Sequence, residues 1–172
     1  MKRILVAVAS QHGATHDIAN TIADTLRESL AATGERTSVD VLACSDVRDV
    51  SGYQAAVIGS AVYMGWWMDA ARELVRREQN TLTMMPVWLF SSGPVGDPPR
   101  PPEEAVDVAE VGQRCHAREH RIFGGRIERK RLGFRQRAIL TALRVPDGDY
   151  RDWNEIREWA RKIARDLANE PG

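Results

Sequence analysis

Residues 2–26 read KRILVAVASQHGATHDIANTIADTL, and the hydrophobic periodicity of this stretch changes at Ser10–Thr15. Before that loop, Lys2–Ala9 is a nearly continuous apolar run, which is typical of a parallel strand covered on both faces. After it, apolar residues recur with helical spacing at Ile18, Ala19, Ile22, Ala23, Leu26 and Leu30. Gly34 is a suitable end for that helix. A buried strand followed by a short loop and an amphipathic helix predicts the first half of a βαβ unit.

The same alternation continues to the end of the chain. Strands are also predicted at Thr37–Leu42, Gln54–Ser60, Met85–Ser91 and His120–Ile127, and helices at Asp69–Arg77, Glu103–Glu119 and Phe134–Arg144. A last helix has a buried stripe of Trp153, Ile156, Ala160, Ile163 and Leu167. The proline-rich residues 93–102 are predicted to form a surface loop. This pattern predicts an α/β three-layer sandwich, with a five-stranded parallel sheet in the order 2-1-3-4-5 and helices on both faces.

Length and composition support one ordinary globular domain over residues 1–172. The apolar run Ile4–Ala9 is far shorter than the roughly 20 residues of a membrane span, and no signal-peptide cleavage site follows it. The two cysteines, Cys44 and Cys115, lie far apart without the spacing of metal ligands. We therefore expect no metal, two cysteines that are small core residues, and a reduced cytoplasmic setting.

Three loops of unusual composition follow the first, third and fourth predicted strands, whose carboxyl ends share the ligand-binding edge of such a sheet. The first consists of Ser10, Gln11, His12, Gly13, Ala14 and Thr15. Hydroxyls, a glycine and a helix start suit a phosphate group. The nucleotide patterns GxxxxGK[ST] and GxGxxG are absent, so a phosphomonoester such as that of FMN fits better than ATP or NAD. An ordinary βα turn capped by Thr15 or Ser10 is the alternative, and His12 is either a phosphate donor or a plain loop residue.

The second and third loops suit a flat ring. The second consists of Ser60, Ala61, Val62, Tyr63, Met64, Gly65 and Trp66. Its Tyr63, Met64 and Trp66 are candidates to cover a heteroaromatic ring, while Trp67 is expected to pack a helix against the sheet. The third loop consists of Ser91, Ser92, Gly93, Pro94, Val95 and Gly96, and it offers backbone groups to a ring edge or forms a surface turn. Together the three loops predict an FMN site.

These residues resemble the flavodoxin superfamily. Ser10, Gly13 and Thr15 match its phosphate-binding pattern [ST]-x-[TS]-G-x-[ST], whereas His12 departs from the usual hydroxyl. The chain is similar in particular to the flavodoxin-like, quinone-dependent protoporphyrinogen oxidases. That resemblance spans nearly the whole chain and includes VIGSAVYMGWW at 57–67, HRIFGGRI at 120–127 and DYRDW at 149–153.

The resemblance implies a flavodoxin-like fold with non-covalent FMN held by Ser10, Gln11, Gly13, Ala14, Thr15, Ser60–Gly65 and Ser91–Gly96. It further implies that electrons pass from protoporphyrinogen IX through FMN to a membrane quinone. No catalytic acid–base residues are expected, because the flavin performs the redox chemistry. A flavodoxin-type electron carrier without its own substrate is the alternative. A degenerate fold without FMN is disfavoured by the three intact loops.

The charge is unevenly distributed, since residues 114–144 contain ten basic and two acidic side chains in a chain of zero net charge. The basic residues that we expect to bind a partner are Arg126, Arg129, Lys130, Arg131, Arg135 and Arg137. They suit an anionic membrane surface, porphyrin propionates or an acidic protein. The alternative is a solvated helix packed on the sheet by its apolar side. A nucleic-acid partner is not expected. Binding to a membrane would place this cytoplasmic protein at the inner face of that membrane. The formation of a homodimer is a further possibility.

Overall fold

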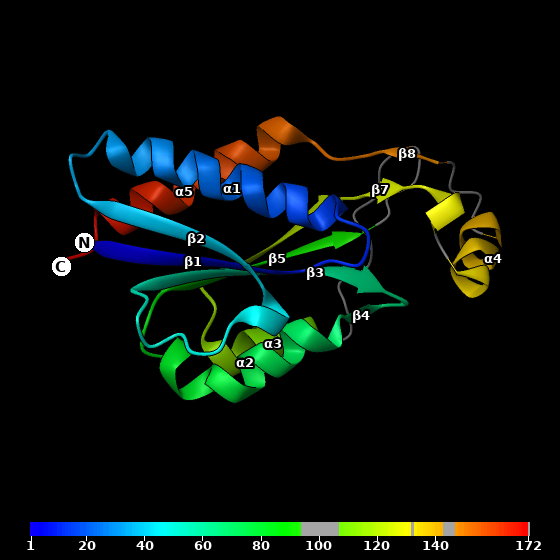
Figure 1. Ribbon diagram of the computed structural model, residues 1–172, viewed down its shortest axis with the longest axis horizontal. Helices are drawn as coiled ribbons and strands as arrows, with labels where there is room; N and C mark the ends of the chain where they lie inside the picture. The colour runs from blue at the N-terminus through cyan, green and yellow to red at the C-terminus, as the bar shows by residue number, and fades with distance from the viewer. Residues whose placement is uncertain (94–106, 132, 143–146, 172) are drawn as a thin grey trace.

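The computed structural model describes residues 1–93, 107–131, 133–142 and 147–171. Its centre is a parallel sheet of β1 (Lys2–Ala9), β2 (Thr37–Ala43), β3 (Ala55–Tyr63), β5 (Val87–Gly93) and β6 (Glu119–Gly124). The order β2-β1-β3-β5-β6 confirms the predicted order 2-1-3-4-5 (Figure 1). A short strand, β4 (Trp66–Trp67), is added to β3 in the antiparallel direction.

Helices cover both faces of the sheet. One face is covered by α1 (Ala14–Ala31) and α5 (Trp153–Ala168), and the other by α2 (Asp69–Leu82) and α3 (Val108–Cys115) (Figure 1). Successive side chains of a strand point to opposite faces. In β1, therefore, Ile4, Val6 and Val8 join the core under α1 and α5, while Leu5, Ala7 and Ala9 join the core under α2 and α3. This double burial explains why β1 is a continuous apolar run.

Several predicted strand boundaries were wrong. β3 does not end at Ser60, because it continues to Tyr63 and pairs there with β4. β5 is shifted toward the C-terminus relative to Met85–Ser91, since its parallel pairing with β6 continues to Gly93. The predicted strand His120–Ile127 is two strands, β6 and β7 (Arg126–Ile127), and β7 leaves the sheet to pair with β8 (Gly148–Asp149).

Helix boundaries also differ from the prediction. α2 extends past Arg77 to Leu82, whose fully buried side chain continues the apolar stripe of the helix. α3 ends at Cys115 rather than Glu119, because His116 adopts a left-handed conformation with φ of 50°. Residues 103–106 of the predicted helix lie outside the described residues. The final helix is confirmed, with Ile156, Ala160, Ile163 and Leu167 all buried, whereas Trp153 of the predicted stripe is only partly buried.

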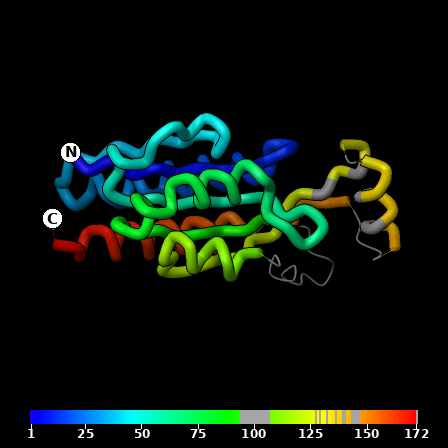
Figure 2. The backbone as a smooth tube through the Cα atoms, turned by 90° about the horizontal axis from the view of Figure 1, so that it is seen from below, coloured from blue at the N-terminus to red at the C-terminus, as the bar shows by residue number. Residues whose placement is uncertain are grey.

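A basic arm, defined as the described residues from Arg126 to Asp149, extends from one end of the sandwich (Figures 1 and 2). It contains the β7–β8 pair, the 3₁₀ helix η2 (Arg129–Arg131) and α4 (Phe134–Ala142). Every α4 side chain that the structure describes is exposed. The alternative of a helix packed on the sheet was wrong, because α4 lies beyond the end of the sandwich and the helices α1, α5, α2 and α3 cover the faces of the sheet (Figure 1). The predicted helix end at 143–144 lies outside the described residues.

Candidate functional site

The three predicted loops begin side by side at the carboxyl edge of the sheet. The register pairs Ala9 of β1 with Ser60 of β3, and Ser60 with Ser91 of β5. Ser10, Ala61 and Ser92 therefore follow at adjacent points of one edge. The predicted order of the strands already implied that the three loops would lie side by side. Pro94, Val95 and Gly96 of the third loop lie outside the described residues.

The loop between β1 and α1 has the backbone geometry of an anion site. Gly13 is the N-cap of α1 and adopts a φ of 87°, in the left-handed region that favours glycine. Its N–H donates to the Ser10 hydroxyl at 3.1 Å, and its carbonyl accepts from the Asp17 N–H at 3.0 Å. Neither Ser10 nor Thr15 is the N-cap, and no side chain caps the helix. The first N–H groups of α1 are thus left for a ligand or water, at the positive end of the helix dipole.

His12 supplies a second feature of an anion site. Its Nε2 atom is buried and has no hydrogen-bond partner among the described residues. A buried polar group without a partner costs about 1–3 kcal/mol, so such groups are usually satisfied by a ligand or water. A phosphate oxygen at the start of α1 would accept a hydrogen bond from this ring. The residues present therefore fit the phosphate group of FMN.

The second loop is a β-hairpin turn between β3 and β4. Tyr63 pairs with Trp66, and the two residues between them, Met64 and Gly65, have φ of 49° and 84°. Positive φ at both central residues is the requirement of a type I′ turn. The turn leaves Met64 65% exposed and Trp66 45% exposed, so both side chains lie at the surface of this edge. Trp67 is buried against the sheet, as predicted.

Ser60 and Ser91 use their hydroxyls inside the protein. The Ser60 hydroxyl accepts from the Met68 N–H at 2.9 Å and donates to the Ala61 carbonyl at 2.8 Å. The Ser91 hydroxyl accepts from the Trp67 indole N–H at 2.8 Å and lies 2.7 Å from Nε2 of His120. These two serines thus hold the wall of the site. Any contact from these two residues to a cofactor would come from their main chain.

Two further contacts in this wall could not be predicted from the sequence. His120 has a structural role here, since its Nε2 atom lies 2.7 Å from the Ser91 hydroxyl. Asp107, which is nearly buried, accepts a hydrogen bond from the Trp67 N–H at 3.2 Å. No spacing in the sequence signals either contact, because each joins elements that only the sheet brings together.

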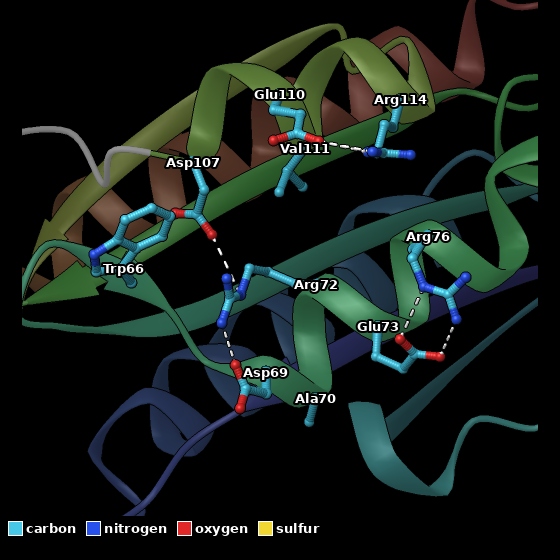
Figure 3. A pocket seen from close by; sticks show the side chains of 10 residues that line it. All are labelled: Trp66, Asp69, Ala70, Arg72, Glu73, Arg76, Asp107, Glu110, Val111 and Arg114. Carbon is cyan, nitrogen blue, oxygen red and sulfur yellow. Dashed lines mark hydrogen bonds and ion pairs between the residues drawn. The ribbon is translucent and has the colours of Figure 1, made fainter.

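An open groove of about 610 Å³ lies beside the hairpin, between α2 and α3 (Figure 3). Its charged side chains are paired with one another. Arg76 bonds Glu73 at 2.7 Å, Arg114 bonds Glu110 at 2.7 Å, and Arg72 pairs with Asp69. The Arg72 guanidinium also lies 5.6 Å from the Trp66 ring centroid. These pairs balance most of the charge in the groove. Trp66 lines the groove, which does not form a second charged site.

Residues 5–154 match the model of the flavodoxin domain family. The chain belongs to this family. Flavodoxin domains bind FMN, so the cofactor expected from the three loops is confirmed. The family supports a role in electron transfer or in an oxidoreductase reaction.

Solved structures share the flavodoxin-like fold at low sequence identity. An archaeal flavodoxin is 15% identical with a TM-score of 0.62, over 96% of this chain and 98% of that one. An oxidoreductase from Corynebacterium diphtheriae is 14% identical with a TM-score of 0.64, over 99% of each chain. Rubredoxin oxygen:oxidoreductase from Desulfovibrio gigas is 14% identical with a TM-score of 0.65, over 97% of this chain and 36% of that one. At these identities the likeness shows the fold alone. No curated protein matches the chain in sequence.

The part of the chain that the structure describes contains no group of three or more His, Cys, Asp or Glu side chains placed to hold a metal ion. It also contains no helix with the length and apolar character needed to cross a membrane. Cys44 and Cys115 are free and buried, as expected of small core residues.

Proposed function

We propose that this protein is an FMN-dependent oxidoreductase that takes electrons from a reduced small molecule and passes them to an acceptor. Three features at one sheet edge carry the proposal: the start of α1 without a side-chain cap, the exposed hairpin Tyr63–Trp66, and the Nε2 atom of His12, which has no partner among the described residues. When bound, FMN supplies one- and two-electron chemistry.

The residues of this edge would bind and shield the cofactor. The start of α1 and His12 would hold the phosphate, while Ser10 fixes the loop between them through its bond to Gly13. Tyr63 and Trp66 would flank the ring and exclude water from it. The Trp67–Ser91–His120 hydrogen bonds keep the wall behind the ring in place. None of these residues is needed as an acid or base, because the redox steps belong to the cofactor.

For the substrate, we propose a porphyrinogen, with a quinone as acceptor. The resemblance to flavodoxin-like protoporphyrinogen oxidases supports this substrate, and the basic arm offers positive charge that would suit its propionates. Electron-carrier flavodoxins are expected to be acidic around the flavin, which steers basic partners. This chain instead has zero net charge and an exposed basic arm, which favours an enzyme.

A flavodoxin-type electron carrier is the second candidate function. The likeness to the archaeal flavodoxin over nearly the whole of both chains supports it. The two candidates share the FMN site and differ in whether the protein has its own substrate. A single pair of assays therefore separates them.

The first assay is FMN binding to the purified protein, followed by the visible spectrum and by quenching of flavin fluorescence. We expect stoichiometric binding, and the absence of binding would overturn both candidates. The second is anaerobic oxidation of protoporphyrinogen IX with a soluble quinone. Turnover that requires FMN supports the enzyme. A protein that binds FMN and exchanges electrons with a reductase, but does not oxidise the porphyrinogen, is a carrier.

We propose that the basic arm docks on an anionic membrane surface, where a quinone would be available. Phe134 is 87% exposed, and Lys130, Arg131 and Arg135 are exposed beside it. Exposed aromatic and basic side chains together suit the headgroup region, where each charge contributes about 1 kcal/mol. Vesicles with and without anionic lipid provide the test. Replacing Lys130, Arg131 and Arg135 by Gln should abolish the preference for anionic vesicles, whereas replacing Arg157, Arg161 and Arg165 on α5 should not. Equal binding by both variants would overturn the membrane proposal.

A further inference from the structure

Arg151 is a nearly buried cation at the end of the site where α1 begins. Its side chain is 5% exposed. The guanidinium donates to both carboxylate oxygens of Asp149, from Nε at 2.8 Å and from Nη2 at 2.7 Å. Its Nη1 donates to the Asp17 carboxylate at 3.1 Å and to the Ala14 carbonyl at 3.3 Å. The same group lies 4.6 Å from the Trp153 ring centroid.

These contacts join two parts of the chain that are far apart in sequence. Ala14 and Asp17 form the first turn of α1, whose free N–H groups face the predicted phosphate. Asp149 lies in β8, at the root of the basic arm, opposite Arg126 of β7. Arg151 therefore attaches the root of the arm directly to the phosphate-binding turn. A buried guanidinium bonded on three sides holds its partners in one geometry.

Asp17 creates an electrostatic conflict that Arg151 resolves. A carboxylate in the first turn of a helix stabilises the positive end of the helix dipole. The same negative charge repels a phosphate group bound at that end. The Arg151 guanidinium lies against this carboxylate and therefore reduces its repulsion of an anion at the start of α1. The pKa of Arg151 is raised, first of all by its hydrogen bond to Asp149, so the positive charge persists at every working pH.

We propose that Arg151 is a positioning residue of the FMN phosphate site, which offsets the negative charge of Asp17 and holds the first turn of α1. This inference rests on the proposed FMN function. Riboflavin has the same ring as FMN but no phosphate. Loss of Arg151 should therefore weaken the binding of FMN and not that of riboflavin, whereas loss of a merely structural residue would weaken both.

The experiment measures dissociation constants for FMN and riboflavin by fluorescence quenching of the full chain. Arg151→Gln should weaken FMN binding about tenfold, which corresponds to about 1.4 kcal/mol, and change riboflavin binding less than twofold. Asp17→Asn in the same protein should restore most of the lost FMN affinity, because the double variant has the net charge of the wild type around the turn. The matched control is Arg161→Gln, which removes an exposed positive charge from α5 and should change neither dissociation constant.

The single variant Asp17→Asn tests the inference even if Arg151→Gln does not fold. Asp17 is exposed, and its substitution leaves Arg151 bonded to Asp149. This variant should bind FMN more tightly than the wild type and riboflavin equally well. Unchanged or weaker FMN binding by Asp17→Asn would overturn the inference, and so would an equal loss of FMN and riboflavin binding in Arg151→Gln. A wild-type protein that binds neither flavin would overturn the proposed function instead.

Discussion

The indole N–H of Trp67 donates a hydrogen bond to the Ser91 hydroxyl at 2.8 Å. This bond connects the β3–β4 hairpin to β5, two elements that form adjacent walls of the proposed flavin site. Because Ser91 is also 2.7 Å from His120 Nε2, one hydroxyl links three elements of the sheet edge. The hairpin that presents Tyr63 and Trp66 is therefore held from behind by a buried polar network.

Removal of the Ser91 hydroxyl should destabilise the protein more than the loss of a single oxygen atom would suggest. Ser91→Ala leaves the Trp67 indole N–H without its Ser91 acceptor and His120 without its Ser91 partner. We therefore expect the free energy of unfolding to fall by about 2 kcal/mol. The matched control is Ser92→Ala, which removes the same atom from the neighbouring buried residue. Urea unfolding of the apo-protein measures both. An equal loss in the two variants would show that the network contributes nothing specific.

His12 should contribute to binding and not to stability. His12→Ala removes a buried nitrogen that has no partner within the described structure, so the apo-protein should be as stable as the wild type. FMN binding should weaken at least about tenfold, because a hydrogen bond to a charged group contributes about 1.5–3 kcal/mol and a tenfold change corresponds to about 1.4 kcal/mol. Riboflavin binding should not change. His116→Ala, at an exposed histidine after α3, is the control. Retention of full FMN affinity would remove His12 from the phosphate site.

Both cysteines should be unreactive in the folded protein. Burial raises the pKa of the Cys44 thiol to about 12 and that of Cys115 to about 11. At pH 8 the reactive thiolate is then roughly 0.1% or less of either group. A disulfide reagent such as Ellman's reagent should detect no fast-reacting thiol in the native protein and two in 6 M guanidinium chloride. Rapid labelling of the native protein at either position would contradict this burial.

Acid should weaken the attachment of the arm to α1. The Arg151 hydrogen bond holds the pKa of Asp149 below its ordinary value of 3.8. A carboxylate with a lowered folded-state pKa stabilises the native state fully above its unfolded pKa, and this contribution is lost as pH falls through the folded value. Asp149→Asn should therefore reduce stability at pH 7 and reduce the further loss between pH 4 and pH 2. Urea unfolding at pH 7, 4 and 2 measures the difference.

The control for this pH series is Asp46→Asn, at an exposed residue of the 3₁₀ helix η1 (Cys44–Asp46). It should leave the acid dependence of the wild type in place. If Asp149→Asn also keeps that dependence unchanged, the ion pair with Arg151 does not contribute to acid stability.

The secondary structure near the N-terminus could be predicted almost completely, whereas the hairpin could not. The bounds of β1 were predicted to the residue, because a strand buried on both faces is apolar at every position. The continuation of β3 to Tyr63 was missed. It depends on a turn with positive φ at Met64, a conformation that a methionine side chain rarely adopts and that its identity does not signal.

The sequence by itself determined the order of the sheet and the edge at which the three loops meet. Both follow from local periodicity and from the handedness of βαβ units, which are short-range properties of the chain. Only the tertiary structure decided how the polar groups are used. It places the Ser60 and Ser91 hydroxyls inside the wall, leaves His12 Nε2 unpartnered within the described residues, and brings Arg151 to Asp17 across 134 positions. Apolar patterns record which side chains are buried, but the partner of a buried polar group depends on which distant elements pack against it.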